Sequence, residues 1–342
     1  MRIGNGPLAR VMGLAVCLSS MVLGLPSRAE EAPTAKQGCQ LLKAGVMPLE
    51  IVGNALLVQA KINGKAARFV IGTSSNATVV SSHALERLMD GTDLKYAAPR
   101  NGSVEIRKTT FDSLEIGSWK ATNVELWIGP IGEIGGGDDV VGVLGMNVLG
   151  QYDMEFDLAH NLLTLYQPLG CEKSELAYWS DTYSLAEMDD DPAPRARIRL
   201  PVMVNGQVVH AQINTSNAIS LLDEGLTQNL GLAVQALDNP PSDGATFHHF
   251  AVLDTIAIGD ENVKHPKIRV VDLFKGGEAY VGSRLKTTYN DGVRLNLGVD
   301  FLKAHRVLVA FSQRKIYFTY GGGPLFQLRG SGTSQAVIAS PP

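Results

Sequence analysis

The chain has 342 residues, with 30 basic and 34 acidic side chains and 45% hydrophobic residues. That length is enough for one large domain or two of ordinary size. No basic stripe runs along the sequence, so nucleic acid is not expected as a partner.

The first 29 residues are expected to be an export signal rather than part of the fold. Arg2 and Arg10 give a positive start, residues 11–25 are almost wholly apolar, and small residues precede a cleavage site after Ala29. The stretch is too short for a lasting membrane span, although an uncleaved anchor is the alternative. Cleavage leaves 27 basic and 34 acidic residues, a net charge of −7. No later segment is long and apolar enough to cross a bilayer. We therefore expect a periplasmic or secreted protein without a stable membrane span.

Two cysteines, Cys39 and Cys171, remain after cleavage. In an oxidising compartment an isolated pair more often forms a bridge than stays free. We expect a disulfide that closes most of the first half of the chain into one loop. Two buried, unpaired thiols are the alternative.

The sequence repeats itself. Residues 62–73 read INGKAARFVIGT and residues 204–215 read VNGQVVHAQINT, an offset of 142. The same offset places LEIG at 114–117 on IAIG at 256–259. Several matching blocks in the same order indicate a duplicated unit.

A later block fixes where the copies differ in length. VLGMNVLGQY at 143–152 matches NLGVDFLKAH at 296–305, at an offset of 153, so the second copy has gained 11 residues. We place this gain in residues 274–292, which are rich in glycine and polar residues.

Each copy is predicted to be β. The dipeptides Asn63-Gly64 and Asn205-Gly206 each join two short apolar runs, which is a strong hairpin signal. Helical signals are few and short. The expected strands are 56–62, 66–71, 124–128, 154–158, 162–166, 197–204, 208–213, 307–311 and 315–320, and the expected short helices are 81–90, 146–151, 223–230 and 299–305.

The repeats divide the chain into five expected parts. They are the signal 1–29, a first lobe 30–170, a connection 171–196 in which 178–185 has strand character, a second lobe 197–321, and a disordered tail 322–342.

These landmarks together resemble a known family. In each copy an apolar strand leads into Xaa-Thr-Xaa-Xaa, a short helix follows, and a Leu-Gly-Xaa-Xaa-Xaa-Leu segment comes about 70 to 85 residues later. The pattern, over residues 49–320, is similar to that of the retropepsin-like and pepsin-like aspartic proteases, in the bacterial exported form with two lobes in one chain. The resemblance implies a mainly β fold of two homologous six-stranded, β-barrel-like lobes around a central cleft that fits a peptide.

The catalytic residues of that family are absent from the matching positions. Each lobe of such a protease brings one aspartate to the cleft floor, where two close carboxylates share a proton and exchange the roles of acid and base. Here Gly72 and Asn214 stand at those positions. No catalytic residue is therefore expected.

The neighbouring residues are partly retained. Thr73 and Thr215 match the family threonines, which the resemblance implies join the lobes by hydrogen bonds. Ser74 and Ser216 replace the glycines of the motif. We expect these four residues to be structural or to line the cleft.

Other acids were considered as substitutes. Asp138 and Asp139 precede the first Leu-Gly segment and Asp300 follows the second, so a carboxylate near the cleft is conceivable. A solvated loop for the first two and a helix start for Asp300 are favoured, because a displaced acid also needs a partner and a held water.

Serine, metal and phosphate sites are not favoured. Ser75 joins the two motif serines at the floor, but only His83 is near and no triad spacing is present. His248 and His249 are adjacent on a strand and point to opposite faces, so they suit exposed hairpin positions better than a shared metal. Residues 132–137 are glycine-rich but lack the lysine of a phosphate loop. Alternating Asp153, Glu155 and Asp157 are expected on a solvated edge. We expect no metal and no cofactor.

Three functions fit these residues. The favoured one is an exported, inactive protease relative that binds an extended peptide or serves as part of an assembly. A hydrolase with displaced acids and a purely structural β protein are the alternatives.

Overall fold

The computed structural model describes residues 38–53, 55–88, 107–129, 139–190, 197–238, 248–274, 278–280, 286–288, 292–326 and 328. The expected signal, residues 1–29, lies outside this part. The described chain is mainly β, as the sequence predicts, with four short helices. None of these helices is long and apolar enough to span a membrane.

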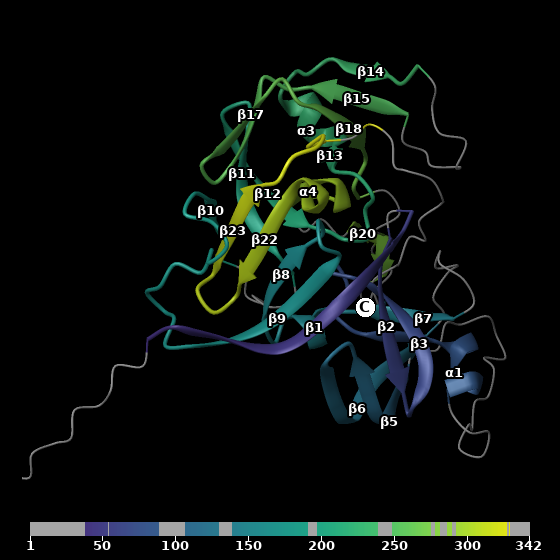
Figure 1. Ribbon diagram of the computed structural model, residues 1–342. Coiled ribbons are helices and arrows are strands. Elements are labelled where there is room, and N and C mark those ends of the chain that lie inside the picture. Colours follow the sequence, from purple (N-terminus) through teal and green to yellow (C-terminus); the bar gives the residue numbers. More distant parts are fainter. Residues whose placement is uncertain are drawn as a thin grey trace, which may run out of the picture. The chain divides into compact units, whose positions relative to one another are not determined.

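The first repeat forms a closed barrel (Figure 1). Its strands follow the order β2-β3-β7-β4-β6-β5, and β5 pairs with β2 to close the ring. Helix α1 (Ser82–Leu88) follows β4. The barrel strands are β2 (Ala55–Ile62), β3 (Lys65–Ile71), β4 (Val79–Ser81), β5 (Arg107–Ile116), β6 (Trp119–Gly129) and β7 (Val140–Leu144).

A second group of strands joins the two repeats. Its order is β10-β23-β22-β8-β9-β1, and the end of β1 continues into the barrel by pairing with β2. Strand β8 of the first repeat pairs antiparallel with β22 of the second. We call these six strands the central sheet: β1 (Gln40–Val52), β8 (Asp153–Asp157), β9 (Leu162–Leu169), β10 (Ser184–Glu187), β22 (His305–Ala310) and β23 (Lys315–Tyr320).

The second repeat forms an open, curled sheet rather than a closed ring. Its order is β14-β15-β18-β13-β21-β12-β11-β16-β17. The long β5–β6 hairpin of the first repeat corresponds here to two shorter pairs, β16–β17 and β15–β18. The break falls at His265 and Pro266, and Pro266 has no N–H for the ladder. The strands are β11 (Arg199–Val204), β12 (Gln207–Ile213), β13 (Leu221–Asp223), β14 (Val234–Ala236), β15 (His249–Val252), β16 (Thr255–Ile258), β17 (Glu261–Lys264), β18 (Lys267–Val271) and β21 (Val293–Leu297).

The remaining elements are short. Helices α2 (Met146–Leu149), α3 (Glu224–Asn229) and α4 (Val299–Ala304) lie where short helices are predicted. The region predicted to hold the extra residues of the second copy contains β19 (Glu278–Tyr280) and β20 (Lys286–Thr288), a separate two-stranded sheet.

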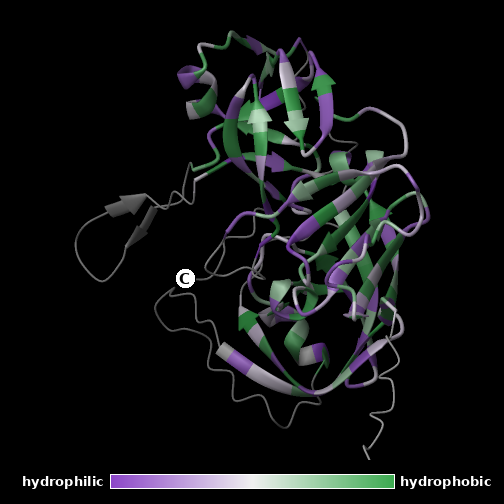
Figure 2. Ribbon diagram, turned by 90° about the vertical axis from the view of Figure 1, so that its left-hand side faces the viewer, coloured by the Kyte–Doolittle hydropathy of each residue, from purple (hydrophilic) through white to green (hydrophobic). Residues whose placement is uncertain are grey.

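Local sequence explains the strand pairing. Asn63 and Gly64 have φ values of 50° and 77°, and Asn205 and Gly206 have 47° and 82°. Positive φ at both central residues matches the twist of a two-residue hairpin. Residues of β11 then alternate between buried and more exposed positions, and Figure 2 shows hydrophobic and hydrophilic segments along the strands. One hydrophobic core cluster extends through both repeats.

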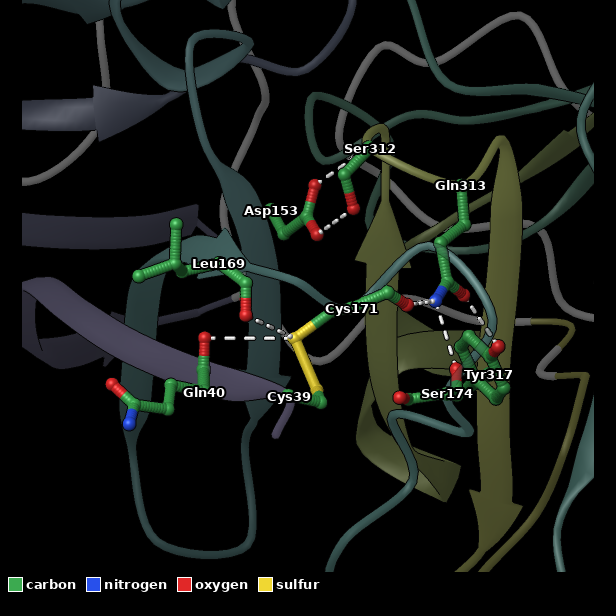
Figure 3. Close-up of a disulfide and its surroundings, with 9 residues drawn as sticks. All are labelled: Cys39, Gln40, Asp153, Leu169, Cys171, Ser174, Ser312, Gln313 and Tyr317. Carbon is green, nitrogen blue, oxygen red and sulfur yellow. Dashed lines mark hydrogen bonds between the residues drawn. A yellow bond between two sulfur atoms is a disulfide. The ribbon is translucent and has the colours of Figure 1, made fainter. Parts of the chain in front are cut away.

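The predicted disulfide is present between Cys39 and Cys171, which are separated by 132 residues. It joins the start of β1 to the segment after β9, beside the ladder that these strands already form. Figure 3 shows that the side-chain amide of Gln313 donates to the carbonyl oxygen of Cys171, so the turn after β22 contacts the bridge. The bridge therefore fixes one end of the central sheet.

The expectation of a solvated edge for the acidic residues of β8 is wrong. Asp153, Glu155 and Asp157 are only 2%, 2% and 7% exposed. Strand β8 lies between β22 and β9 rather than at an edge. The alternating pattern looked like an edge strand because the sequence does not reveal the partners that bury it.

Those partners satisfy the buried carboxylates. Glu155 accepts hydrogen bonds from Tyr166 Oη at 2.9 Å, Tyr178 Oη at 2.7 Å and Arg306 Nε at 2.6 Å. Burial raises the pKa of Tyr166, and the nearby Glu155 carboxylate adds to this. Asp153 accepts from the backbone N–H and the hydroxyl of Ser312. The bonds from Arg306 and Ser312 cross from the second repeat to the first.

Part of the expected tail is also described. Leu325 and Phe326 are partly buried against the main core. Arg269, 2% exposed on β18, donates to the carbonyl oxygen of Leu328. This segment therefore packs against the second repeat at least as far as residue 328.

Removal of the disulfide is expected to destabilise the protein. In the chain-entropy model a loop of this length is stabilised by up to about 4–5 kcal/mol. We predict that Cys39→Ser/Cys171→Ser lowers the free energy of unfolding by about 2–5 kcal/mol, measured by urea denaturation. Reductant should bring the wild type to the variant's midpoint and leave the variant unchanged. Equal midpoints without reductant would contradict this.

Loss of the buried Glu155 charge is expected to weaken the junction between the repeats. Glu155→Gln places an amide donor against three donors, so we predict a loss of about 2–4 kcal/mol in unfolding free energy. The exposed pair of Lys108 and Glu125 offers a control. Glu125→Gln should cost about 1 kcal/mol or less, and a similar loss from both variants would contradict the prediction.

Candidate functional site

Two equivalent turns meet where β3 and β12 end. In the first repeat the N–H of Gly72 donates to the carbonyl oxygen of Leu144 at 3.0 Å. In the second repeat, the N–H of Asn214 donates to the carbonyl oxygen of Leu297 at 2.9 Å. Each turn is thus held by the parallel strand beside it, β7 or β21. The predicted site residues 72–74 and 214–216 are brought together from the two repeats.

Thr73 and Thr215 join the two turns reciprocally. The N–H of Thr73 donates to Thr215 Oγ1 at 3.0 Å, and the N–H of Thr215 donates to Thr73 Oγ1 at 3.0 Å. Each hydroxyl donates in turn to a carbonyl of the other repeat, that of Ile213 at 2.8 Å and that of Ile71 at 2.6 Å. Both threonines are 1% exposed. These contacts fit the lobe-joining role that the resemblance implied.

The two motif serines also meet. Ser74 Oγ lies 3.1 Å from Ser216 Oγ, and both residues are partly buried. Only one of the two hydroxyls donates in this contact, so the other retains a proton for a further acceptor. The two turns are therefore joined at two successive positions, by the threonine contacts and then by the serine contact.

The space beside Gly72 is already filled. A Cβ atom built at Gly72 would lie 2.4 Å from Cγ1 of Val143. Real Cβ atoms do not approach another carbon so closely, so any side chain at position 72 requires Val143 on β7 to move. Position 72 therefore carries no side chain, and one could be placed there only if Val143 moved.

The side chain of Asn214 is held in one orientation. Its Oδ1 accepts from the backbone N–H of Ser216 at 2.9 Å. Because a backbone N–H can only donate, this contact identifies the oxygen and places Nδ2 on the other side of the amide. Asn214 is 8% exposed, and Nδ2 makes no hydrogen bond with the residues that the structure describes.

Asp300 has a structural position. It is 1% exposed and accepts from Ser220 N–H at 2.9 Å and Ser220 Oγ at 2.7 Å. The corresponding pair in the first repeat is Thr78 and Asn147, where the amide oxygen accepts from the threonine N–H and hydroxyl at 2.6 and 2.8 Å. Because a neutral amide fills the same place in the other copy, Asp300 needs no proton exchange for this role.

Asp139 lies in an ion pair. Arg68 donates to its two carboxylate oxygens at 2.6 and 2.5 Å, and the hydrogen bonds from this guanidinium lower the pKa of Asp139. A general acid needs the opposite shift, towards working pH. Asp138 lies outside the described residues, as do residues 132–137.

Within the described residues, the hydroxyl groups of the serines at the two turns contact each other or a backbone carbonyl rather than a histidine or an acid. Ser75 donates to the carbonyl oxygen of Ala77 at 2.7 Å, as a turn serine does. His83 is exposed on α1. His249 is exposed on β15 and His248 is half-buried just before it. No group of three or more potential metal ligands occurs in the described part of the chain.

Two features of the site were missed from the sequence. Thr78 and Asn147 correspond to Ser220 and Asp300 at the offsets of 142 and 153, so a full comparison of the copies would have shown that the two pairs are equivalent, although not that their members are in contact. The filling of the space at Gly72 by Val143 carries no such signal, because it depends on how closely β3 and β7 approach.

Comparison with known proteins bears on the expected resemblance. Residues 58–148 match the family model described as aspartyl protease. No curated protein matches the sequence. Solved structures similar to this chain include the following three. The aspartic proteinase from Irpex lacteus is 12% identical, with 84% of this chain and 99% of that chain covered and a TM-score of 0.48. Basic 7S globulin from soybean is 10% identical, with 82% of this chain and 95% of that chain covered and a TM-score of 0.44. A retropepsin-like aspartic protease from Rickettsia conorii is 20% identical, with 38% of this chain and 94% of that chain covered and a TM-score of 0.27.

The match covers β2 to α2, that is, the barrel, the turn at Gly72 and the first Leu-Gly segment. The mainly β architecture of two related lobes is the one that the resemblance implied. Residues 58–148 are thus similar in sequence to the aspartyl proteases, and the described chain folds as two related, mainly β repeats.

Proposed function

We propose that the protein is an exported, non-hydrolytic relative of the aspartic proteases that binds an extended polypeptide without cleaving it. The observation that carries this proposal is the pair of turns at Gly72 and Asn214, which meet in the manner of an active site and hold no carboxylate. Peptide hydrolysis by this fold requires two close carboxylates that share one proton. Neither a glycine nor an amide exchanges protons at working pH.

The acids considered as substitutes do not meet that requirement. Asp300 is occupied by Ser220, and Asp139 is held by Arg68. Loss of one general acid or base alone typically costs 10²–10⁴-fold in rate. A rate above background from this floor therefore requires a group that the described residues do not provide.

Binding is supported by hydrogen-bond donors at the two turns that the described residues do not use. The Nδ2 group of Asn214 has two N–H donors that are not used by the described residues, and the serine pair has one further hydroxyl proton. A backbone carbonyl of an extended polypeptide is the acceptor that suits such donors. Under this proposal Asn214 holds a peptide carbonyl where a protease would activate water.

Export is supported by the disulfide. Cys39 and Cys171 form a bridge, and such bridges persist in oxidising compartments. The expected signal over residues 1–29 supports the same location. Both features agree with a periplasmic or secreted protein.

A purely structural protein is the second candidate. The contact between Ser74 and Ser216 and the methyl group of Val143 at Gly72 favour it, because both fill the floor with the chain's own atoms. This candidate expects no ligand at Asn214, so binding measurements separate the two.

We predict that the mature wild-type protein cleaves no member of a diverse peptide library between pH 3 and 7. A Gly72→Asp/Asn214→Asp/Val143→Ala variant tests whether a restored acid pair can act, with the alanine making room for the new carboxylate. Cleavage by this variant alone would show that the library contains suitable substrates.

Cleavage by the wild type that a pepstatin-like inhibitor stops would contradict the proposal. Asp139→Asn and Asp300→Asn then test the displaced acids. Loss of that cleavage in either variant would establish the hydrolase alternative.

Peptide binding is predicted to depend on the donors of Asn214. Asn214→Asp replaces them with a carboxylate that repels a carbonyl oxygen, so we expect affinity for bound library peptides at pH 7 to fall about tenfold or more. Gln167→Ala, at an exposed position of β9, should leave affinity unchanged. Titration calorimetry measures both. Equal affinities of Asn214→Asp and wild type would contradict the carbonyl contact, and no binding by wild type would favour the structural candidate.

A further inference from the structure

Each repeat fastens a hairpin to the central sheet, and the first does so with neutral groups. The turn of the β5–β6 hairpin passes through Gly117, with a φ of 57°. The next residue, Ser118, is held against β1. The N–H of Val46 donates to Ser118 Oγ at 2.8 Å, and the N–H of Ser118 donates to the carbonyl oxygen of Val46 at 3.1 Å.

The second repeat makes the same contact with an acid. The turn of the β16–β17 hairpin passes through Gly259, with a φ of 56°, at the offset of 142 from Gly117. The N–H of Leu185 on β10 donates to Asp260 Oδ1 at 2.7 Å. Asp260 therefore takes the place of Ser118, and β10 takes the place of β1.

A second contact beside each turn differs in the same way. In the first repeat Trp119 Nε1 donates to Tyr152 Oη at 3.0 Å. The equivalent residues of the second repeat are Glu261 and His305, at offsets of 142 and 153. His305 Nε2 lies 3.2 Å from each carboxylate oxygen of Glu261. An ionisable pair stands where the first copy has a neutral hydrogen bond.

The ring of His305 is surrounded so that both nitrogens face oxygen. Its Nδ1 lies 2.8 Å from the carbonyl oxygen of Phe301, which only accepts, so Nδ1 must carry a proton. The Nε2 atom faces Glu261. The His305 side chain is 0% exposed and that of Glu261 is 18% exposed, so water does not readily replace either contact.

The protonation state of the ring therefore decides the contact. When the imidazole is charged, Nε2–H donates to the Glu261 carboxylate and the pair attracts. When the imidazole is neutral, the proton stays on Nδ1 and the lone pair of Nε2 faces a carboxylate, so the hydrogen bond is lost. Histidine is the side chain whose charge ordinarily changes between pH 5 and 8. The contact is therefore complete when the ring is charged and weakened when it is neutral.

Among the described residues, Glu261 is the charged group that contacts the ring of His305. The rings of Phe301 on α4 and of Phe318 and Tyr320 on β23 pack against it. Arg306 is directed to Glu155 and Asp157. The remaining nearby charges are exposed and belong to Lys303 on α4, and Asp260 and Lys264 on the β16–β17 hairpin.

We propose that Glu261 and His305 form a pH-dependent latch that holds the β16–β17 hairpin of the second repeat to the central sheet in acid and loosens it above neutrality. The hairpin pairs with β11, and β11 pairs with β12, which leads to Asn214. The latch thus acts on the sheet that carries the second turn. This inference is independent of the proposed peptide binding.

Hydrogen exchange of the full mature chain tests the latch. Protection factors of the β16–β17 amides, corrected for the intrinsic exchange rate at each pH, are measured at pH 5.5 and 8. We expect them to be about tenfold higher at pH 5.5 in the wild type, the effect of one charge-assisted hydrogen bond. The β5–β6 amides of the first repeat should show no such difference.

Two variants separate the latch from general effects of pH. Glu261→Gln offers an oxygen to the charged ring and an N–H to the neutral ring, so its hairpin should be equally protected at both pH values. Trp119→Phe should weaken the β5–β6 hairpin by the same factor at both. A wild-type hairpin whose protection does not change with pH, or a Glu261→Gln variant that changes as the wild type does, would overturn the proposal.

Discussion

The arrangement of the protein depends on one reciprocal contact, in which Thr73 and Thr215 each donate to and accept from the other repeat. A contact of this kind is self-complementary, as in a symmetric dimer, because each position meets its own copy. It brings the ends of β3 and β12 together and thereby fixes where residues 72 and 214 lie. Since both threonines are buried, loss of either hydroxyl would leave backbone groups of the other repeat unsatisfied.

The same pseudosymmetry continues through the central sheet. Strands β8 and β22 pair antiparallel, and the hairpins that contain them correspond at the offset of 153. The charged groups here are not symmetric, since Asp153 and Arg306 occupy equivalent positions. Buried polar groups that are fully hydrogen-bonded favour one arrangement over its alternatives. The contacts from Glu155 to Arg306 and from Asp153 to Ser312 therefore select how the copies join.

Much of the fold could be predicted because the signals were local or repeated. Asn63-Gly64 and Asn205-Gly206 fix hairpins through backbone geometry alone, and the offset between copies located the extra residues of the second. Cys39 and Cys171 required only the inference of an oxidising compartment. The two turns of the site were found in the same way, because the copies align across them.

What could not be predicted depends on contacts between distant residues. The acids of β8 alternate as on an exposed edge, and only the arrival of β22 buries them. The second hairpin is split at His265 and Pro266, and its lobe is an open, curled sheet where the first lobe is a closed barrel. The space at Gly72 was lost to a methyl group of Val143 from another strand. Tertiary packing decides each of these.

The copies differ in where they carry ionisable groups. Two carboxylates held side by side repel each other when both ionise, so an aspartic-protease floor carries a cost that varies with pH. Here Val143 fills one position, and Asn214 in the other accepts an ordinary backbone hydrogen bond. Neither group titrates, so this floor keeps the same hydrogen bonds in acid and at neutrality. In the hairpins the second copy carries ionisable side chains where the first copy has neutral ones, since Asp260 and Glu261 correspond to Ser118 and Trp119. The ionisable residues that distinguish the two hairpins therefore lie at the junction of one lobe with the central sheet, where they affect how firmly that lobe is held.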